Sequence, residues 1–179
     1  MNWQQMVEER NVWVARNFPD PDGNRTPLDS VLGCIEEIGE LTHHHLKQAQ
    51  SIRGTDDFHE KEARDAIGDC SVYLMGVMSY FTIVPQMMRS VIPGNAGYPD
   101  EDKLVLQAAR WAGRLADNEI TWHDRRQAQI CVDWMVATMI TYCELRGWSY
   151  EQIVTDTWDH VKQRDWILYP ETGLPPVMV

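Results

Sequence analysis

The sequence has little positive charge. Its 16 Lys and Arg residues stand against 27 Asp and Glu residues, which gives a formal net charge of −11. Nonspecific binding to nucleic acid needs a basic surface, so this charge balance argues against a nucleic-acid partner. A small phosphorylated substrate remains compatible with it, because bound metal ions can reverse the local field.

Long hydrophobic runs and closely spaced cysteine pairs are also missing, and we expect no secretory leader. The most apolar run, Cys70 to Val84, is shorter than a membrane span and ends at Pro85. The first ten residues contain neither the basic nor the apolar region of a signal peptide. The four cysteines are scattered without CxxC spacing, which favours buried, reduced thiols. We therefore expect a cytoplasmic protein without membrane contact.

Apolar residues recur at helical spacing, and no stretch alternates as a β-strand does. The pattern predicts helices over residues 2–17, 27–50, 57–84, 101–118, 123–146 and 150–166. Thr26 is expected to cap the second helix, and Asp57 with Glu60 and Ser149 with Gln152 resemble capping boxes. The segment from Pro93 to Pro99 is the strongest break. These features predict one all-α domain over residues 1–179, a four-helix-bundle-like core with additional helices.

Two acidic clusters stand on consecutive predicted helices. They comprise Glu36, Glu37 and Glu40 on the first helix, and Glu62, Asp65 and Asp69 on the second. Within each cluster the spacing puts the acids on one helix face, and an antiparallel hairpin turning near Gly54 would bring the clusters level. Several carboxylates in a mostly apolar layer cannot all stay ionised without cations. A hard divalent ion with oxygen ligands, most simply Mg²⁺, is the expected neutraliser.

Other interpretations of the clusters remain open. A Glu-rich helix is commonly just a solvated face. Glu40 and His43 form a Glu-x-x-His motif as in di-iron bundles, but such a bundle needs a second motif, and the sequence has none. A helical regulatory or interaction protein with a relic acidic site is a third interpretation, and metal analysis and activity assays separate the three.

Several basic and aromatic residues are candidates for binding a phosphorylated substrate. The basic candidates are Lys47, Arg53, Lys162 and Arg164. Phosphate contact and ordinary surface charge are equally consistent with their positions. Trp13 and Trp166 are the best candidates for stacking on a nucleobase.

The chain also contains a faint internal repeat. Residues 31–41 align with residues 105–115, and residues 69–75 align with residues 133–139. In the second copy, Arg110, Trp111 and Arg114 stand where the first has its three glutamates. Residues 84–135 are therefore interpreted as a helical insertion, or as a degenerate repeat of the hairpin over residues 27–83. Either interpretation predicts at most one metal cluster per chain.

These motifs resemble the MazG-like, all-α nucleoside triphosphate pyrophosphatases, whose hallmark is Glu-x-x-Glu followed on the next helix by Glu-x-x-Asp. Glu37-x-x-Glu40 matches the first element, and Asp69 matches the final Asp. The sequence departs from the pattern at Ala66, where Asp65 and Glu62, on the acidic stripe of the same helix, are the expected substitutes. The resemblance covers about residues 13–83 and 140–173.

The resemblance implies Mg²⁺-dependent cleavage, with Mn²⁺ as a substitute, of a nucleotide between its α and β phosphates. The products would be a monophosphate and pyrophosphate. It implies metal ligation by Glu37, Glu40, Asp65 and Asp69, and catalytic roles for Glu36, Glu37, Glu40 and Asp69. It also implies a homo-oligomer, most simply a dimer, or an internal pseudo-dimer.

Overall fold

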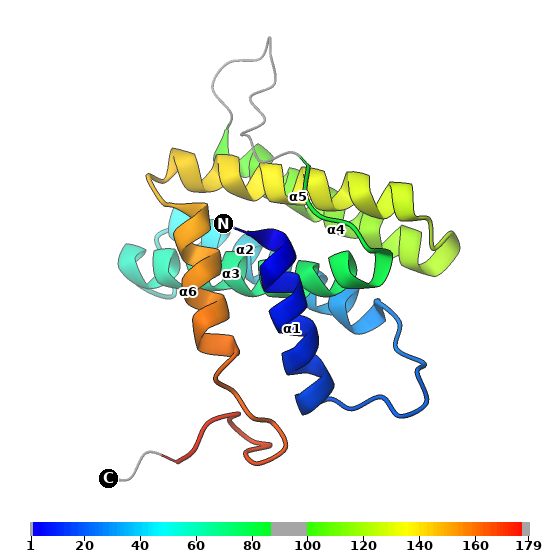
Figure 1. Cartoon of the computed structure of the whole chain (residues 1–179). Helices are drawn as coiled ribbons and strands as arrows, with labels where there is room; N and C mark the ends of the chain where they lie inside the picture. Colours follow the sequence, from blue (N-terminus) through cyan, green and yellow to red (C-terminus); the bar gives the residue numbers. More distant parts are fainter. Residues whose placement is uncertain (1, 87–99, 177–179) are drawn as a thin grey trace.

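The protein is all-α in the part of the chain that the structure describes, residues 2–86 and 100–176 of a computed structural model (Figure 1). These residues contain six helices and no strand, which confirms the predicted fold class. The helices are α1 (Trp3–Asn17), α2 (Leu28–Ala49), α3 (Asp56–Phe81), α4 (Glu101–Thr121), α5 (Arg125–Leu145) and α6 (Tyr150–Val161). The predicted break from Pro93 to Pro99 lies outside the described residues.

The helix starts follow local hydrogen bonding, with two corrections to the sequence prediction. Thr55, rather than Asp57, caps α3, because its Oγ1 accepts a hydrogen bond of 3.2 Å from the backbone N–H of Phe58. Pro27 occupies the cap position of α2, although Thr26 Oγ1 still accepts from the N–H of Leu28. The predicted Ser149 cap of α6 is confirmed by a 3.2 Å bond from the Gln152 N–H to Ser149 Oγ.

The last helix is shorter than predicted and ends at Val161 instead of Trp166. Beyond it the chain folds back on itself, and the N–H of Asp165 donates to the carbonyl of Gly173. Gly173 has a φ of 72°, a left-handed conformation that glycine adopts without strain. The tail therefore forms a turn that closes against residues just after α6.

Two helical hairpins make up the bundle. The helices α2 and α3 form the first hairpin and α4 and α5 the second, with α2 packed on α4 and α3 on α5. The predicted repeat segments fall in α2 and α4 and in α3 and α5. The fully buried side chains between the helices include Leu41, Ile67, Leu74, Met75, Met135, Met139 and Tyr142. Burial of this apolar surface is the main stabilising term of the fold.

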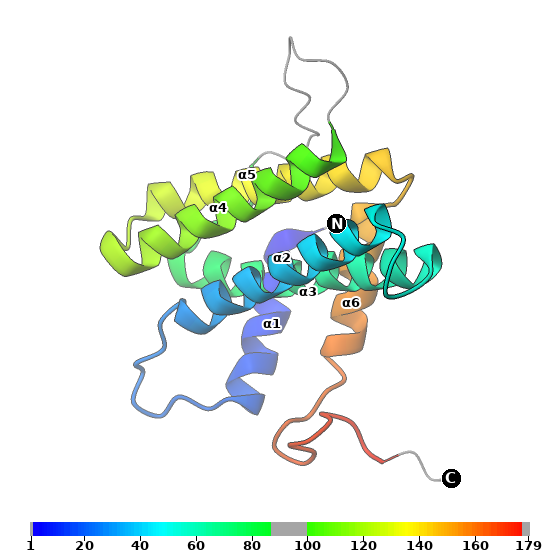
Figure 2. The same ribbon diagram turned by 180° about the vertical axis from the view of Figure 1, so that it is seen from behind.

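The helices α1 and α6 cross α3 on one side of the bundle, while α2 and α4 lie on the other (Figures 1 and 2). Gly68 permits the close approach of α6, because a Cβ at that position would collide with the side chain of Thr157. Gly33 of α2 likewise leaves space for the ring of Tyr73 on α3. These small residues set the helix spacing around the acidic clusters. Within the described residues, no helix is long and apolar enough to cross a membrane.

Candidate active site

Glu37 is the buried centre of the acidic clusters. Its side chain lies between α2 and α3 with 9% of its surface exposed, whereas Glu36 and Glu40 are exposed. The pKa of Glu37 is raised to about 8, first by burial and then by the negative charges of Asp69 and Glu40. Glu36 and Asp65 raise this pKa further. Acids from both helices therefore act on one buried carboxyl group, the convergence that the hairpin predicts.

Asp69 is the second perturbed acid. Burial, followed by the charge of Asp65, raises its pKa to about 6, while Arg164 and His160 oppose the shift. Asp69 thus lies between an acidic group of side chains and a basic group that comes from the end of the chain. Asp69 therefore interacts electrostatically with both the acidic and the basic group.

The departure at Ala66 has a simple structural context. Ala66 is buried in the bundle at 2% exposure, whereas Asp65 is exposed. The charge of Asp65 nevertheless raises the pKa of both Glu37 and Asp69. Glu62 is engaged by its neighbour, since the Lys61 ammonium donates to it at 2.8 Å. Asp65 is therefore the acid of this stripe that acts on the buried pair.

The donor chemistry of the clusters suits a hard cation, because it consists of carboxylate oxygens with excess negative charge. The raised pKa of Glu37 and of Asp69 shows that these acids tend to retain protons when no cation neutralises them. Among residues 2–86 and 100–176, however, no three Asp, Glu, His or Cys side chains are already arranged to hold a metal ion. Ligation would therefore require side-chain rotation in addition to the observed convergence.

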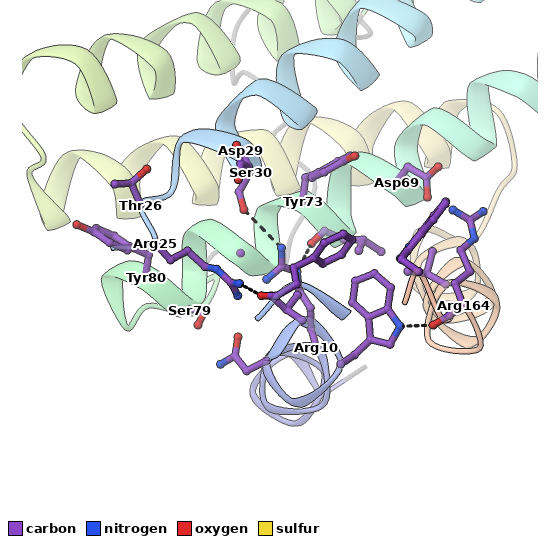
Figure 3. A pocket seen from close by; sticks show the side chains of 18 residues that line it. Arg10, Arg25, Thr26, Asp29, Ser30, Asp69, Tyr73, Ser79, Tyr80 and Arg164 are labelled. Carbon is purple, nitrogen blue, oxygen red and sulfur yellow. Dashed lines mark hydrogen bonds between the residues drawn. The ribbon is translucent and has the colours of Figure 1, made fainter. Parts of the chain in front are cut away.

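A cavity of about 680 Å³ opens beside Asp69 (Figure 3). It lies between α1, the segment leading into α2, α3 and the residues that follow α6. Its charged and polar lining residues are Arg10, Asn11, Arg25, Thr26, Asp29, Ser30, Asp69, Ser79 and Arg164, and its aromatic ones are Trp13, Phe18, Tyr73, Tyr80 and Trp166. Asp69 thus belongs to both the acidic clusters and the cavity.

Three guanidinium groups make part of this cavity basic. Arg10 is partly buried, and it donates hydrogen bonds to two neutral groups, the carbonyl of Val72 at 3.1 Å and the hydroxyl of Ser30 at 3.5 Å. Burial, followed by the charge of Arg25, lowers the pKa of Arg10 to about 10. A buried cation with neutral partners and a second cation nearby is a favourable environment for an anion.

The aromatic lining is held in place by hydrogen bonds between α1 and the tail. The Trp13 indole N–H donates to the carbonyl of Arg164 at 2.9 Å. The backbone N–H of Trp166 donates to Asn17 Oδ1 at 2.7 Å. The Arg164 guanidinium lies 5.8 Å from the centre of the Trp166 ring. Both tryptophans that the sequence suggested for stacking therefore line the cavity, on elements that contact each other.

Tyr73 connects the cavity with the buried glutamate. The pKa of Tyr73 is raised by burial and then by the charges of Glu37 and Glu36. Because Tyr73 also lines the cavity, the electrostatic influence of the acids extends to its wall.

The structure separates the predicted basic residues into two groups. Arg164 lines the cavity, whereas Lys47, Arg53 and Lys162 are not among its lining residues. The Lys47 ammonium donates to Gln50 at 3.1 Å, at the far end of α2. Arg53 is exposed in the turn between α2 and α3, and Lys162 pairs with Asp159 at 2.5 Å. These three residues therefore do not form part of the cavity wall.

Sequence reasoning missed Arg10 and Arg25. Arg10 lies three residues before Trp13 on α1, a spacing that puts both on one helix face, and this signal was available. Arg25 precedes α2 in a loop, and its guanidinium donates to the carbonyl of Phe18. Nothing local in the sequence indicates that this loop folds beside Arg10.

The histidines near the first cluster pack with one another. His43 is exposed and its ring lies 5.0 Å from that of His44. His44 and His59 place their Nδ1 atoms 3.1 Å apart. His43 and His44 are therefore polar residues that pack near the turn of the hairpin.

The cavity and the acidic clusters meet at Asp69 and together form the candidate functional site of the all-α bundle. Comparisons with protein-family models, curated proteins and solved structures find no match for this chain. The function is therefore argued from the site itself.

Proposed function

We propose that the protein is a Mg²⁺-dependent nucleotide pyrophosphohydrolase. It would cleave a ribo- or deoxyribonucleoside triphosphate between the α and β phosphates, giving a monophosphate and pyrophosphate. One observation carries the proposal: Asp69 belongs both to the acidic clusters and to the cavity lined by arginine and aromatic side chains. A nucleotide contains the groups that these two regions bind.

The cavity suits a nucleotide in size and chemistry. Its volume of about 680 Å³ lies within the range of small-molecule sites. Trp13, Trp166 or Tyr80 can stack on a base, because aromatic faces bind planar rings. Arg10 and Arg164 can bind phosphate oxygens through charge-assisted hydrogen bonds.

The acids supply the remaining chemistry. Glu37, Glu40, Asp65 and Asp69 would hold Mg²⁺, which when bound would neutralise phosphate charge. Glu36 and Glu40 are exposed carboxylates, and either can orient a water molecule and accept its proton during hydrolysis. Arg10 and Arg164 would stabilise the negative charge of the phosphates as the anhydride bond breaks.

A screen of ribo- and deoxyribonucleoside triphosphates, with Mg²⁺ or with EDTA, tests the proposal. Chromatography and phosphorus NMR should detect a monophosphate and pyrophosphate only when Mg²⁺ is present. The Glu40→Gln variant should lose this activity, whereas Glu144→Gln, which changes an exposed acid on α5, should keep it. Failure of every nucleotide to turn over would contradict the proposal and favour a non-catalytic role.

A further inference from the structure

The α2–α3 hairpin closes at a turn (cyan in Figure 2), and two histidines face each other across the helices close to that turn. The Nδ1 atoms of His44 on α2 and of His59 on α3 lie 3.1 Å apart. His59 is buried, with 1% of its surface exposed, and His44 is half-buried. No step of the proposed hydrolysis uses either residue, so the pair needs an explanation of its own.

The hydrogen bonding of His59 fixes which of its ring nitrogens has the free lone pair. The Nε2 atom lies 3.0 Å from the carbonyl oxygen of Ile52. Because a carbonyl oxygen only accepts, Nε2 carries the hydrogen, and the lone pair of the neutral ring is on Nδ1. Metal-binding histidines are commonly oriented in this way, by donating the second ring N–H to a backbone carbonyl. The lone pair of His59 therefore faces His44.

The backbone of the turn holds the His59 ring in this orientation. Ser51 and Arg53 have φ values of 53° and 64°, which are uncommon for residues other than glycine. At Gly54, a Cβ would lie only 3.1 Å from Nε2 of His59, so glycine leaves the ring its space. The turn thus presents the Ile52 carbonyl to the ring and leaves Nδ1 directed at α2.

The distance between the two Nδ1 atoms suits a shared metal ion. Zinc binds imidazole nitrogens at about 2.0–2.1 Å, so two of them bound at about 90–110° lie about 2.8–3.4 Å apart. The observed separation of 3.1 Å falls within this range. One ion would therefore bind both nitrogens without a shift of either helix, once the rings turn their lone pairs toward it.

His44 supplies the second nitrogen after one change of tautomer. Because Nδ1 of His59 accepts, Nδ1 of His44 donates in the metal-free protein. Burial, followed by the charge of His43, lowers the pKa of His44, which favours the neutral ring that metal binding requires. His44 is half-buried, so its hydrogen can move from Nδ1 to Nε2 through solvent. Metal binding then replaces one hydrogen bond with two metal–nitrogen bonds.

Glu62 is the candidate for a third ligand. It lies three residues after His59 on α3, and this spacing puts both on one helix face. Its negative charge acts on His44 more strongly than that of Glu40 does. The present partner of Glu62 is the exposed Lys61, and surface ion pairs of this kind contribute little stability. Rotation of Glu62 away from Lys61 would bring its carboxylate to the histidine pair.

We propose that the Nδ1 atoms of His44 and His59 bind a divalent transition-metal cation, with the Glu62 carboxylate as third ligand and water completing the shell. Imidazole nitrogens suit Zn²⁺, whereas the carboxylates of the acidic clusters suit the harder Mg²⁺. The bound ion links the end of α2 to the start of α3. This site does not depend on the proposed hydrolytic activity.

Calorimetric titration of the full chain with Zn²⁺, in excess Mg²⁺ and without nucleotide, tests the proposal. Wild type should bind one Zn²⁺ per chain, and His44→Gln should weaken binding at least about tenfold, because it removes a ligand. The matched control His43→Gln changes the exposed neighbouring histidine and should bind Zn²⁺ as wild type does. Circular dichroism would verify folding of both variants. Absence of binding by wild type, or equal affinity in His44→Gln, overturns the proposal.

A pair of variants separates this site from the acidic clusters. Asp69→Asn should bind Zn²⁺ with the affinity of wild type, because it leaves the histidine pair intact. His44→Gln should retain the rise in melting temperature that Mg²⁺ produces. Loss of Zn²⁺ binding in Asp69→Asn would place the zinc in the acidic clusters and contradict the proposal.

NMR spectra that correlate the ring protons and nitrogens of the histidines test the ligand atoms. When Zn²⁺ is added, the hydrogen of His44 should move from Nδ1 to Nε2, whereas His59 should keep its hydrogen on Nε2. A His44 ring that keeps its hydrogen on Nδ1 at saturating Zn²⁺ would exclude the proposed coordination.

Glu62→Gln tests the third ligand. This variant should bind Zn²⁺ several-fold more weakly than wild type, because an amide oxygen is a poorer ligand than a carboxylate. The matched control Lys61→Gln removes only the ion pair and should not weaken binding. Equal affinity in Glu62→Gln and wild type would show that Glu62 is not a ligand.

Discussion

The two hairpins of the bundle use matching positions in opposite ways. In the first, Glu37 is buried with 9% exposure, and this burial together with the surrounding acids raises its pKa to about 8. In the second, the matching residue is Trp111, buried with 7% exposure. Its ring stacks on that of Trp134 at 5.4 Å, and the Arg114 guanidinium lies over it at 4.7 Å.

The matching aspartates differ in the same way. Burial and the charge of Asp65 raise the pKa of Asp69 to about 6, although Arg164 opposes the shift. Asp133 instead accepts hydrogen bonds from the backbone N–H of Gln86 at 2.7 Å and from the Gln129 side chain at 3.0 Å. Asp133 is therefore held by hydrogen bonds, whereas Glu37 and Asp69 of the first hairpin lie in a concentration of negative charge. Strongly shifted pKa values of this kind cluster at functional sites.

The largest expected difference between the two hairpins is in turnover. Glu37→Gln should reduce pyrophosphate release by about 10²–10⁴-fold, because it removes a carboxylate from the acidic clusters. Trp111→Phe, the matched change in the second hairpin, should leave turnover unchanged. Steady-state assays of both variants on the best substrate measure this difference. Equal losses in the two would show that the hairpins are not functionally distinct.

For stability, in contrast to turnover, the larger effect should come from a change in the second hairpin. Trp111→Ala should lower the free energy of unfolding by about 3–5 kcal/mol, because it removes a large buried ring and its stacking contact. Glu37→Gln should not destabilise the protein at pH 8, since it removes a carboxyl group whose ionised form is disfavoured by burial. Urea denaturation of both variants measures the two values. Greater destabilisation by Glu37→Gln would reverse the assignment of structural and functional roles.

The pH dependence of stability should come from the first hairpin. The pKa of Glu37 is about 8 in the folded chain, compared with the unperturbed value of 4.5. Between these two pH values the folded state therefore retains a proton that the unfolded state loses. The free energy of unfolding should therefore fall by about 1–3 kcal/mol as the pH rises from 4.5 to 8. Asp69 contributes in the same direction, up to its pKa of about 6.

Urea denaturation in EDTA across this pH range measures the effect. The decline should be smaller in Glu37→Gln, which cannot ionise at this position. Glu144→Gln, on the surface of α5, provides the control and should follow wild type. An unchanged slope in Glu37→Gln would assign the pH dependence to other groups.

Metal binding should produce the smallest of these effects. At pH 8 and about ten times its dissociation constant, Mg²⁺ should raise the melting temperature by about 2–5 °C. Asp69→Asn should abolish the shift, and the matched variant Asp133→Asn should retain it. Differential scanning calorimetry detects changes of this size. If the shift in melting temperature persists in Asp69→Asn but disappears in Asp133→Asn, the metal binds to the second hairpin and the site assignment is contradicted.

The sequence predicts the helices and the coupling of the acids because both depend on local spacing. Periodicity places all six described helices, and the hairpin brings Asp69 close enough to raise the pKa of Glu37. The end of α6 was misplaced, because the fold of the tail depends on the contact between Asp165 and Gly173. Arg10 and Arg25 converge on the cavity only through tertiary packing, so local patterns did not identify that part of the site.

The central claim is that the acidic clusters and the cavity act as one site. Calorimetric titration with a non-hydrolysable nucleoside triphosphate analogue, with and without Mg²⁺, tests it most directly. If the claim is correct, Mg²⁺ should increase the affinity for the analogue at least about tenfold in wild type, and Asp69→Asn should lose this coupling. Nucleotide affinity that is independent of Mg²⁺ in wild type would contradict the claim.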